Sequence, residues 1–543
     1  MREGRARRRA VLMLGASAYA LLFALGSQID ARGFTEPGET ALRFALALPV
    51  ALGVLALLLG RVFPALQAGR GGARRPFRAA PAFLLILVCY VPMFLIEYPG
   101  SFMYDTQRQV YQIAHGRYDA FHPLAHTLLI RLCLSAYGVL QSFEKCAALY
   151  SVIQMTLMAG CFALTCASIA RSCSPRAARM SAAFFALYPA HMAFASNCTK
   201  DGLFAAFFVL FLALGMEMAL TGRMARRRAA LLVLSGAMAC LLRNNMVYAL
   251  AVWAAVLAVP AALRRPRFGR LLLCAVLAVA LSRGANAALM AATHAEDGSV
   301  VEMLSVPIQQ LARARLTAPE CFTDEQKALM DEVFTDANYH TQARLYTRYE
   351  PTLADPVKND LSEDVVRARF GELAAMWASV GARCPGVYLD AFLHLALPSL
   401  YPYRTYRVAQ PYIETGLQPG VLTAPFGQEP MTQPRRFAAV RAWLDEHLFS
   451  TGADGVPVIR WLFNTGGVFW LLLALALRDA YDGCWRRAAV VALPVLLYGT
   501  YLLGPVMQGR YLYPFICSLP LFAARGAGGQ LDQQYEGGFG NGV

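Results

Sequence analysis

Long apolar runs recur through almost the whole chain, and each is close to the length that crosses a lipid bilayer. A hydrocarbon core about 30 Å thick takes about 20 apolar residues per helix, and about twelve runs meet or nearly meet that length. They cover approximately residues 11–28, 42–60, 81–97, 147–170, 180–196, 201–220, 229–243, 246–263, 271–291, 458–477, 488–504 and 511–525. The sequence therefore predicts an all-α polytopic membrane protein with about twelve spans, since helices satisfy their own backbone hydrogen bonds in lipid.

Composition excludes a soluble protein with a single core, because 57% of the 543 residues are hydrophobic and only 16% are charged. The net charge of +15 does not indicate a nucleic-acid partner, since the arginines are spread over short loops. Cytoplasmic loops of membrane proteins retain Lys and Arg. Basic clusters at 2–9, 70–78, 171–179, 223–228, 264–270 and 478–487 all fall on one side of a twelve-span arrangement. We expect a plasma-membrane protein with both termini cytoplasmic and large extracytoplasmic loops.

Two doubtful segments are placed by the same alternation of charge. Counting His122–Leu140 as a span would put the cluster at 171–179 outside, so we expect an amphipathic helix in the outer interface. A first external loop then covers 98–146, within a transmembrane region of about nine spans over 1–291. The stretch from Cys384 to Tyr406, with Asp390 and His394, is also expected to form an interfacial helix.

A second external segment, 292–457, resembles a soluble protein in composition. It holds 21 of the 35 acidic residues against 14 Lys and Arg. Apolar residues recur at three- and four-residue intervals in FTDEQKALMDEVF and LSEDVVRARFGELAAMWASV, which predicts a mainly helical external domain. Residues 458–525 would form three spans, and the Gly- and Gln-rich 526–543 a disordered cytoplasmic tail. Cys321 and Cys384 are the cysteines of this domain that an oxidising compartment could join.

The first external loop concentrates polar residues at a membrane face, in EYPGSFMYDTQRQVYQIAHGRYDAFHPLAHT. Turns at Tyr98-Pro99-Gly100 and at Gly116 delimit a short helix that would present Asp105, Gln109 and Gln112 near one face. A carboxylate held there could accept a proton from an incoming hydroxyl. Asp105 is therefore the candidate catalytic residue. The alternative is that Asp105 caps a helix beginning at Thr106.

Other residues are candidates for binding a substrate. His122 and His126, one helical turn apart, could bind substrate or a metal, although no Glu lies between them as in HExxH, and satisfied interfacial histidines are the alternative. Charges that interrupt or end apolar runs usually mark a site or a paired contact. These are Lys200 (beside Asp201), Arg243, Arg283 and Arg510, a set of cations suited to a lipid phosphate unless Lys200 pairs with Asp201 or Asp105. Gln109 and Arg313 complete the candidate binding residues.

Several of these segments resemble a family of bacterial multispanning membrane proteins related to the GT-C glycosyltransferases. The matching residues are YPGSFMYDTQRQ, FHPLAHT, NCTKDGLF, LRNNMVYA, PIQQLAR, DPVK and RYLYP, in one order along the chain. GT-C enzymes carry a catalytic Asp or Glu in the first large external loop and take sugars from polyprenyl-phosphate donors. The resemblance implies that Asp105 is the general base and that Lys200, Arg243 or Arg510 binds the donor phosphate.

The expected function is transfer of a sugar from a polyprenyl-phosphate donor to an extracytoplasmic glycan, lipid or protein of the cell envelope. No DxD pair accompanies Asp105, so the sequence names no metal ligands and leaves a divalent ion open as a cofactor. Two other classes of function remain. An O-antigen-ligase or polymerase-like enzyme would place its chemistry on Arg313 or His394. A lipid-linked glycan transporter or flippase would need charges near the membrane midplane.

Overall fold

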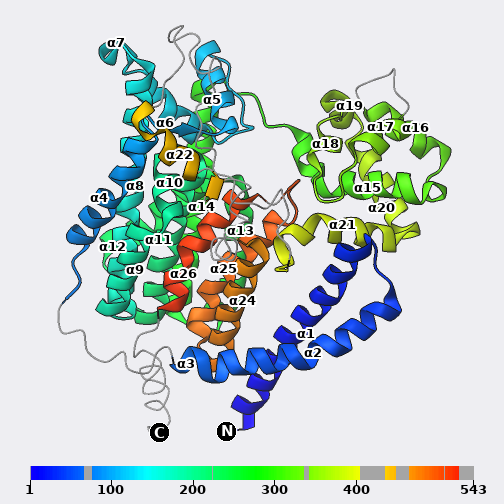
Figure 1. Ribbon diagram of the computed structural model, residues 1–543, viewed down its shortest axis with the longest axis horizontal. Coiled ribbons are helices and arrows are strands. Elements are labelled where there is room, and N and C mark those ends of the chain that lie inside the picture. The colour runs from blue at the N-terminus through cyan, green and yellow to red at the C-terminus, as the bar shows by residue number, and fades with distance from the viewer. Residues whose placement is uncertain are drawn as a thin grey trace.

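The computed structural model describes residues 2–65, 76–222, 224–263, 265–334, 341–403, 434–444, 446–447, 464–506 and 508–524. Within these ranges the chain is helical, with one two-residue pairing of parallel strands, β1 (Ser101–Phe102) and β2 (Asn197–Cys198). A bundle of long helices carries a group of short helices at one end and a separate helical domain to the side (Figure 1). The predicted tail, 526–543, lies outside the described residues.

Seven helices among the described residues are long and apolar enough to cross a membrane. They are Glu3–Arg32 in α1 (Arg2–Arg32), Pro37–Val62 in α2 (Pro37–Leu57) with the π-helix η1 (Leu58–Val62), α4 (Ala79–Ile96), α8 (Phe143–Ser172), α11 (Lys200–Thr221), α13 (Asn244–Ala262) and α14 (Pro266–Thr293). The chain is therefore an all-α, multi-pass membrane protein. The seven spans correspond to seven of the runs predicted from sequence.

The other five predicted spans correspond to helices that are broken, shorter or more charged. The run 180–196 is divided into α9 (Pro175–Leu187) and α10 (Pro189–Ser196), because a proline disfavours helical geometry in the residue before it and Tyr188 is extended. This run is therefore not one continuous helix. The remaining four are α12 (Arg226–Leu242), α24 (Thr465–Asp482), α25 (Trp485–Tyr501) and α26 (Tyr513–Ala523).

Helix α11 is the centre of the bundle. Its interior is apolar on all sides, which is typical of a helix surrounded by other helices. It packs against α8, α12, α25 and α26, and nearly all of its residues are buried. Its two ends carry charged residues, Lys200 and Asp201 in the first turn and Glu217 near the last. These charges are held where protein groups, rather than lipid, can satisfy them.

The predicted first external loop contains three helices, α5 (Tyr104–His115), α6 (Leu124–Leu134) and α7 (Tyr137–Leu140). The predicted single helix His122–Leu140 is instead α6 and α7, separated by a turn at Ser135 and Ala136. The short helix expected before Gly116 is α5, which ends at that glycine in a left-handed conformation. Strands β1 and β2 join the start of this loop to the start of α11.

A second apolar core lies in the helical domain that follows α14. Its described elements are η2 (Val300–Leu304), α15 (Ser305–Thr317), η3 (Pro319–Cys321), α16 (Asp324–Val333), α17 (Thr341–Arg348), α18 (Asp355–Lys358), α19 (Glu363–Ala368), α20 (Phe370–Arg383) and α21 (Pro385–Leu400). Farther on, the structure describes η5 (Arg435–Phe437) and α22 (Ala438–Leu444). Cys321 and Cys384 are both free thiols.

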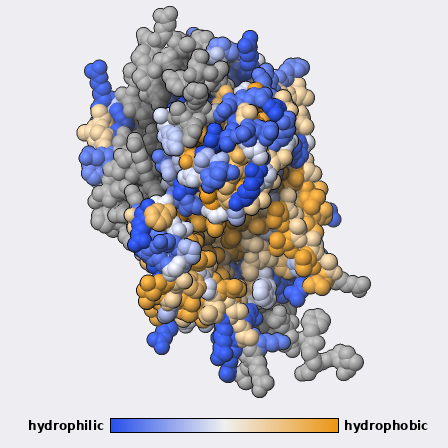
Figure 2. Space-filling model, turned by 90° about the vertical axis from the view of Figure 1, so that its right-hand side faces the viewer, coloured by the Kyte–Doolittle hydropathy of each residue, from blue (hydrophilic) through white to orange (hydrophobic). Residues whose placement is uncertain are grey.

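The hydropathy of the surface differs between the bundle of long helices and the helical domain. Hydrophobic residues dominate the lower part of the molecule in Figure 2, and hydrophilic residues cover much of the domain above it. Helices α1 and α2 form a hairpin beside α24, with an apolar cavity of about 520 Å³ between the three. The described residues that line it, among them Phe23, Val50 and Trp470, include no charged side chain.

Candidate functional site

Three segments far apart in sequence meet at the first turn of α11. The parallel pairing of Phe102 with Cys198 brings the start of α5 beside that turn. Thr199 caps α11 by accepting a hydrogen bond from the backbone N–H of Asp201 at 3.3 Å. The third segment is the 3₁₀ helix η8 (Gly509–Leu512), which carries Arg510 and leads directly into α26.

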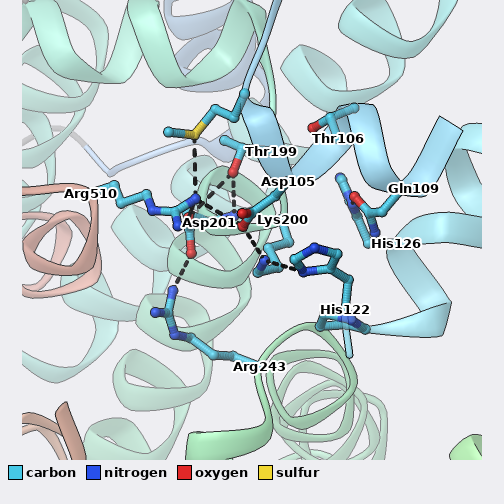
Figure 3. A network of polar contacts seen from close by, with 12 residues as sticks. Asp105, Thr106, Gln109, His122, His126, Thr199, Lys200, Asp201, Arg243 and Arg510 are labelled. Carbon is cyan, nitrogen blue, oxygen red and sulfur yellow. Dashed lines mark hydrogen bonds and ion pairs between the residues drawn. The ribbon is translucent and has the colours of Figure 1, made fainter. Parts of the chain in front are cut away.

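Asp105 lies between two cations. Lys200 Nζ donates to Asp105 Oδ2 at 2.6 Å, and Arg510 Nη1 donates to the same oxygen at 2.9 Å. Figure 3 shows both side chains directed at this carboxylate from opposite sides. Asp105 sits in the first turn of α5, whose N-cap is Met103, so it is not the cap of a helix that begins at Thr106. The contacts of Asp105 are thus ionic and reach across the fold.

Asp201 forms a second ionic centre next to the first. Its Oδ1 pairs with Arg243, which lies at the junction of α12 and α13, and its Oδ2 lies 3.7 Å from Arg510 Nη1. The Arg243 guanidinium also lies over two tyrosine rings, 4.3 Å from the centroid of Tyr511 and 4.8 Å from that of Tyr501. Arg510 therefore links the two carboxylates into one cluster.

Among the residues that the structure describes, the cluster carries more positive than negative charge. Lys200, Arg243 and Arg510 supply three positive charges, and Asp105 and Asp201 supply two negative charges. All five side chains are largely withdrawn from solvent, with exposures of 13%, 10% and 4% for the cations and 10% and 0% for the carboxylates. Burying an unbalanced charge is costly, so this net charge of plus one favours the binding of an anion.

The electrostatics fix the protonation states around Asp105. Burial alone would raise the pKa of the Asp105 carboxyl, but Lys200 and Arg510 outweigh it and hold that pKa well below its usual range. Burial, followed by the charge of Lys200, lowers the pKa of His122 to about 3. His122 is thus neutral, and its Nδ1 lies 3.4 Å from Lys200 Nζ. Asp105 is a paired carboxylate and a weak base in this state.

Gln109 and His126 belong to a separate polar network inside the first loop. His126 is fully buried, and burial lowers its pKa to about 3. Its Nδ1 lies 2.8 Å from Gln109 Oε1 and its Nε2 lies 2.7 Å from the Tyr150 hydroxyl. Tyr150 donates to Gln154 Oε1, and Gln154 Nε2 donates to the Asn197 carbonyl. Both ring nitrogens of His126 have protein partners, so the network positions α5 against α8 and β2.

Two other predicted cations lie elsewhere. Arg313 in α15 pairs with Asp390 in α21, whose Oδ1 is 3.5 Å from His394 Nδ1, so this group belongs to the helical domain. Arg283 is exposed on α14. Neither residue forms a described contact with the Asp105 cluster. The set of cations expected from sequence is thus reduced to Lys200, Arg243 and Arg510.

Sequence reasoning did not assign a site role to Asp201, Tyr501 or Tyr511. The signal for Asp201 was its place beside Lys200 at the start of an apolar run, which indicated ion pairing. Tyr511 follows Arg510 directly, but nothing in the sequence shows that its ring faces Arg243. Among the described residues no group of three or more His, Cys, Asp and Glu side chains could hold a metal ion.

The fold and the cluster define a class, namely multi-pass α-helical membrane proteins with a buried, net positive polar site where α5, α11 and η8 meet. The chain belongs to the family of unknown function DUF6020, whose model matches residues 113–530. This range includes Lys200, Arg243 and Arg510, whereas Asp105 precedes it. No curated protein matches the chain. No solved structure matches it either.

Proposed function

We propose that this protein is a glycosyltransferase of the GT-C type that moves a sugar from a polyprenyl-phosphate donor to an extracytoplasmic acceptor of the cell envelope. The observation that carries the proposal is the buried excess of positive charge around Asp105. An anionic group would neutralise it, and a phosphate is the anion that such a cluster of Lys and Arg fits. We further propose about twelve spans, both termini cytoplasmic, in the plasma membrane, as the alternation of basic loops predicts.

The reaction is a displacement at the anomeric carbon of the sugar. The acceptor oxygen forms a bond to that carbon while the bond from the carbon to the phosphate oxygen breaks. Asp105 takes the proton from the acceptor hydroxyl, and the electron pair of the broken bond stays on the departing polyprenyl phosphate. Lys200 and Arg510 stabilise the charge that develops on this phosphate. The products are the glycosylated acceptor and polyprenyl phosphate.

The pairing of Asp105 is consistent with this role. Its carboxylate is a weak base while Lys200 and Arg510 both hold Oδ2. A bound phosphate competes for the same two cations, and as they turn to the phosphate, the pKa of Asp105 rises towards the value that burial favours. Binding of the donor thereby creates the base. Without these ion pairs, burial would favour a protonated Asp105, which could not act as a base. Lys200 and Arg510 keep the carboxyl ionised until the donor binds.

The test is transfer of a labelled sugar from polyprenyl-phosphate donors by membranes that carry the wild type or Asp105→Asn. Asparagine keeps the size of the side chain and removes the base, so transfer should be lost while the amount and folding of the protein are unchanged. Arg313→Ala serves as the comparison, because Arg313 lies in a different cluster. Transfer retained by Asp105→Asn and lost in Arg313→Ala would favour the ligase-like or polymerase-like alternative instead.

A further inference from the structure

The proposed reaction assigns no role to Asp201, the second carboxylate of the cluster. Its side chain is fully buried in the first turn of α11. Arg243 pairs with one carboxylate oxygen, while Arg510 and the Thr199 hydroxyl lie 3.7 and 3.3 Å from the other. The N-terminus of a helix also stabilises a negative charge. Asp201 thus has a cation near each of its carboxylate oxygens and takes no part in proton transfer, in contrast to Asp105, which takes up a proton during the proposed reaction.

We infer that Asp201 determines the charge of the phosphate that the site accepts, limiting the resting site to an anion with one negative charge. This inference rests on the proposed function, in which the ligand is a lipid-linked phosphate. Three cations and two carboxylates leave a single positive charge for the ligand. A phosphodiester carries one negative charge and neutralises the site, whereas a lipid phosphate with two charges leaves one in excess.

The same sum of charges also accounts for release of the product. In the donor complex, three positive charges face Asp105, Asp201 and one phosphodiester charge, so the sum is zero. Transfer moves one negative charge from Asp105 to the phosphate, because Asp105 gains the acceptor proton as the phosphate oxygen gains the electron pair. The sum is still zero. When Asp105 afterwards loses its proton to solvent, the site holds one negative charge in excess. This excess favours release of the doubly charged lipid phosphate.

Asp201 also positions the two arginines whose charges enter this sum. Arg243 is held between Asp201 and the ring of Tyr511, and Arg510 lies between Asp201 and Asp105. Replacing Asp201 with Asn would raise the net charge to plus two without moving the backbone of α11. A doubly charged phosphate would then neutralise the site, so the preference between the two kinds of phosphate should shift.

The experiment compares two probes on the full chain in detergent at pH 8. One is geranylgeranyl methyl phosphate, which has one negative charge. The other is geranylgeranyl phosphate, which has two at this pH because the second pKa of a phosphate monoester is about 6. We expect the wild type to favour the singly charged probe. In Asp201→Asn the ratio of the two dissociation constants should move towards the doubly charged probe by about tenfold or more, since buried charges interact strongly.

The matched control is Glu217→Gln, which removes another buried, arginine-paired carboxylate from the same helix. Glu217 lies 16 residues from Asp201, which is about 24 Å along α11. We expect Glu217→Gln to keep the ratio of the wild type. Asp201→Glu, which keeps the charge, should also keep it. Lys200→Met lowers the net charge to zero and should move the ratio the other way, and it provides a test even where Asp201→Asn does not fold.

The outcomes separate the two proposals. Binding of neither probe to a folded wild type would remove the phosphate ligand, and with it the proposed function. Binding of both probes with one ratio in the wild type, Asp201→Asn and Lys200→Met would leave a phosphate site but overturn the role of Asp201. An equal shift in Glu217→Gln would show that the overall charge of the protein, and not Asp201, controls the preference.

Discussion

The two ends of α11 carry charged clusters with the same net charge and different surroundings. At the first turn, three cations face Asp105 and Asp201. At the other end, Arg171 and Arg228 both pair with Glu217, which also accepts a hydrogen bond from Ser168 at 2.9 Å. Counted over the described residues, each cluster has one positive charge in excess. The difference lies in where that excess charge meets water.

The arginines at the Glu217 end are 40% and 34% exposed, so water hydrates the charge that the carboxylate does not balance. At the Asp105 end, the side chain of Arg510 is only 4% exposed and that of Lys200 13%. Water stabilises an unbalanced charge that is exposed, so no counter-ion is required there. An unbalanced charge that is buried favours the binding of a counter-charge. Net charge therefore marks an anion site only where it is also desolvated.

The largest expected effect is on catalysis, at the buried end alone. Asp105→Asn should lower the rate of sugar transfer by about 10²–10⁴-fold, the usual contribution of a general base. Glu217→Gln should leave the rate within about twofold, because no reacting group meets that end. Initial rates with a labelled donor, normalised to folded protein, measure both. Equal losses in the two variants would indicate a shared effect on folding and would contradict a catalytic role at the Asp105 end alone.

The next effect is on stability. Arg510 is a partner of both buried carboxylates, and breaking a buried ion pair by removing one partner is strongly destabilising, so Arg510→Met should lower the free energy of unfolding by about 3–5 kcal/mol. Arg228→Met removes a half-exposed partner, and Arg171 still holds Glu217, so about 1 kcal/mol or less is expected. Denaturation of the purified chain in detergent compares the two. A larger loss in Arg228→Met would reverse the assignment of the buried end.

The sequence predicted only part of the charged site at the Asp105 end. Lys200, Arg243 and Arg510 were predicted because charges that interrupt apolar runs need partners. The pairing of Lys200 with Asp105 was an alternative that the sequence left open. The arrival of Arg510 at the same carboxylate was not predictable, because η8 lies 405 residues after Asp105 in the sequence. Pattern alone also placed Arg283 with the others, although its side chain faces outward.

For the fold, length and hydropathy were sufficient for the seven long spans, but not for the shorter helices. Pro189 divides the run 180–196, and a hydropathy window does not register the backbone consequence of one residue. The helices α5 and α6 were within reach of sequence, since Gly116 and Pro123 delimit them. The network of His126 was not, because its partners Tyr150 and Gln154 come from the apolar face of a span.

A third effect concerns pH and His122, which is in contact only with the buried end. The unfolded chain binds a proton on His122 near pH 6.5, whereas the folded chain does so near pH 3. Between these values unfolding takes up a proton, so stability falls as the pH falls, by about 1.4 kcal/mol per pH unit for one group. His122→Asn should make the decline of the unfolding temperature between pH 6.5 and 4 shallower.

Glu217→Gln is the control for this pH effect, since no histidine is among the described partners of Glu217. The decline should not vanish in His122→Asn, because the pKa of His126 is lowered to the same value of about 3. An unchanged slope in His122→Asn would mean that His122 is hydrated and titrates normally. That result would also weaken the conclusion that the Asp105 end is desolvated.

The weakest effect is expected at a third charged cluster, which lies in the helical domain. Arg313 and Asp390 are partly buried, at 14% and 17% exposure, and they balance each other. Burial without excess charge should create no anion site. Arg313→Ala should therefore leave sugar transfer within about twofold of the wild type, with a modest loss of stability because Asp390 loses its partner. Transfer assays and thermal unfolding on the same preparations measure both. A loss of transfer comparable to that of Asp105→Asn, in a folded protein, would place chemistry on a balanced pair, and burial with excess charge would no longer be what distinguishes the site.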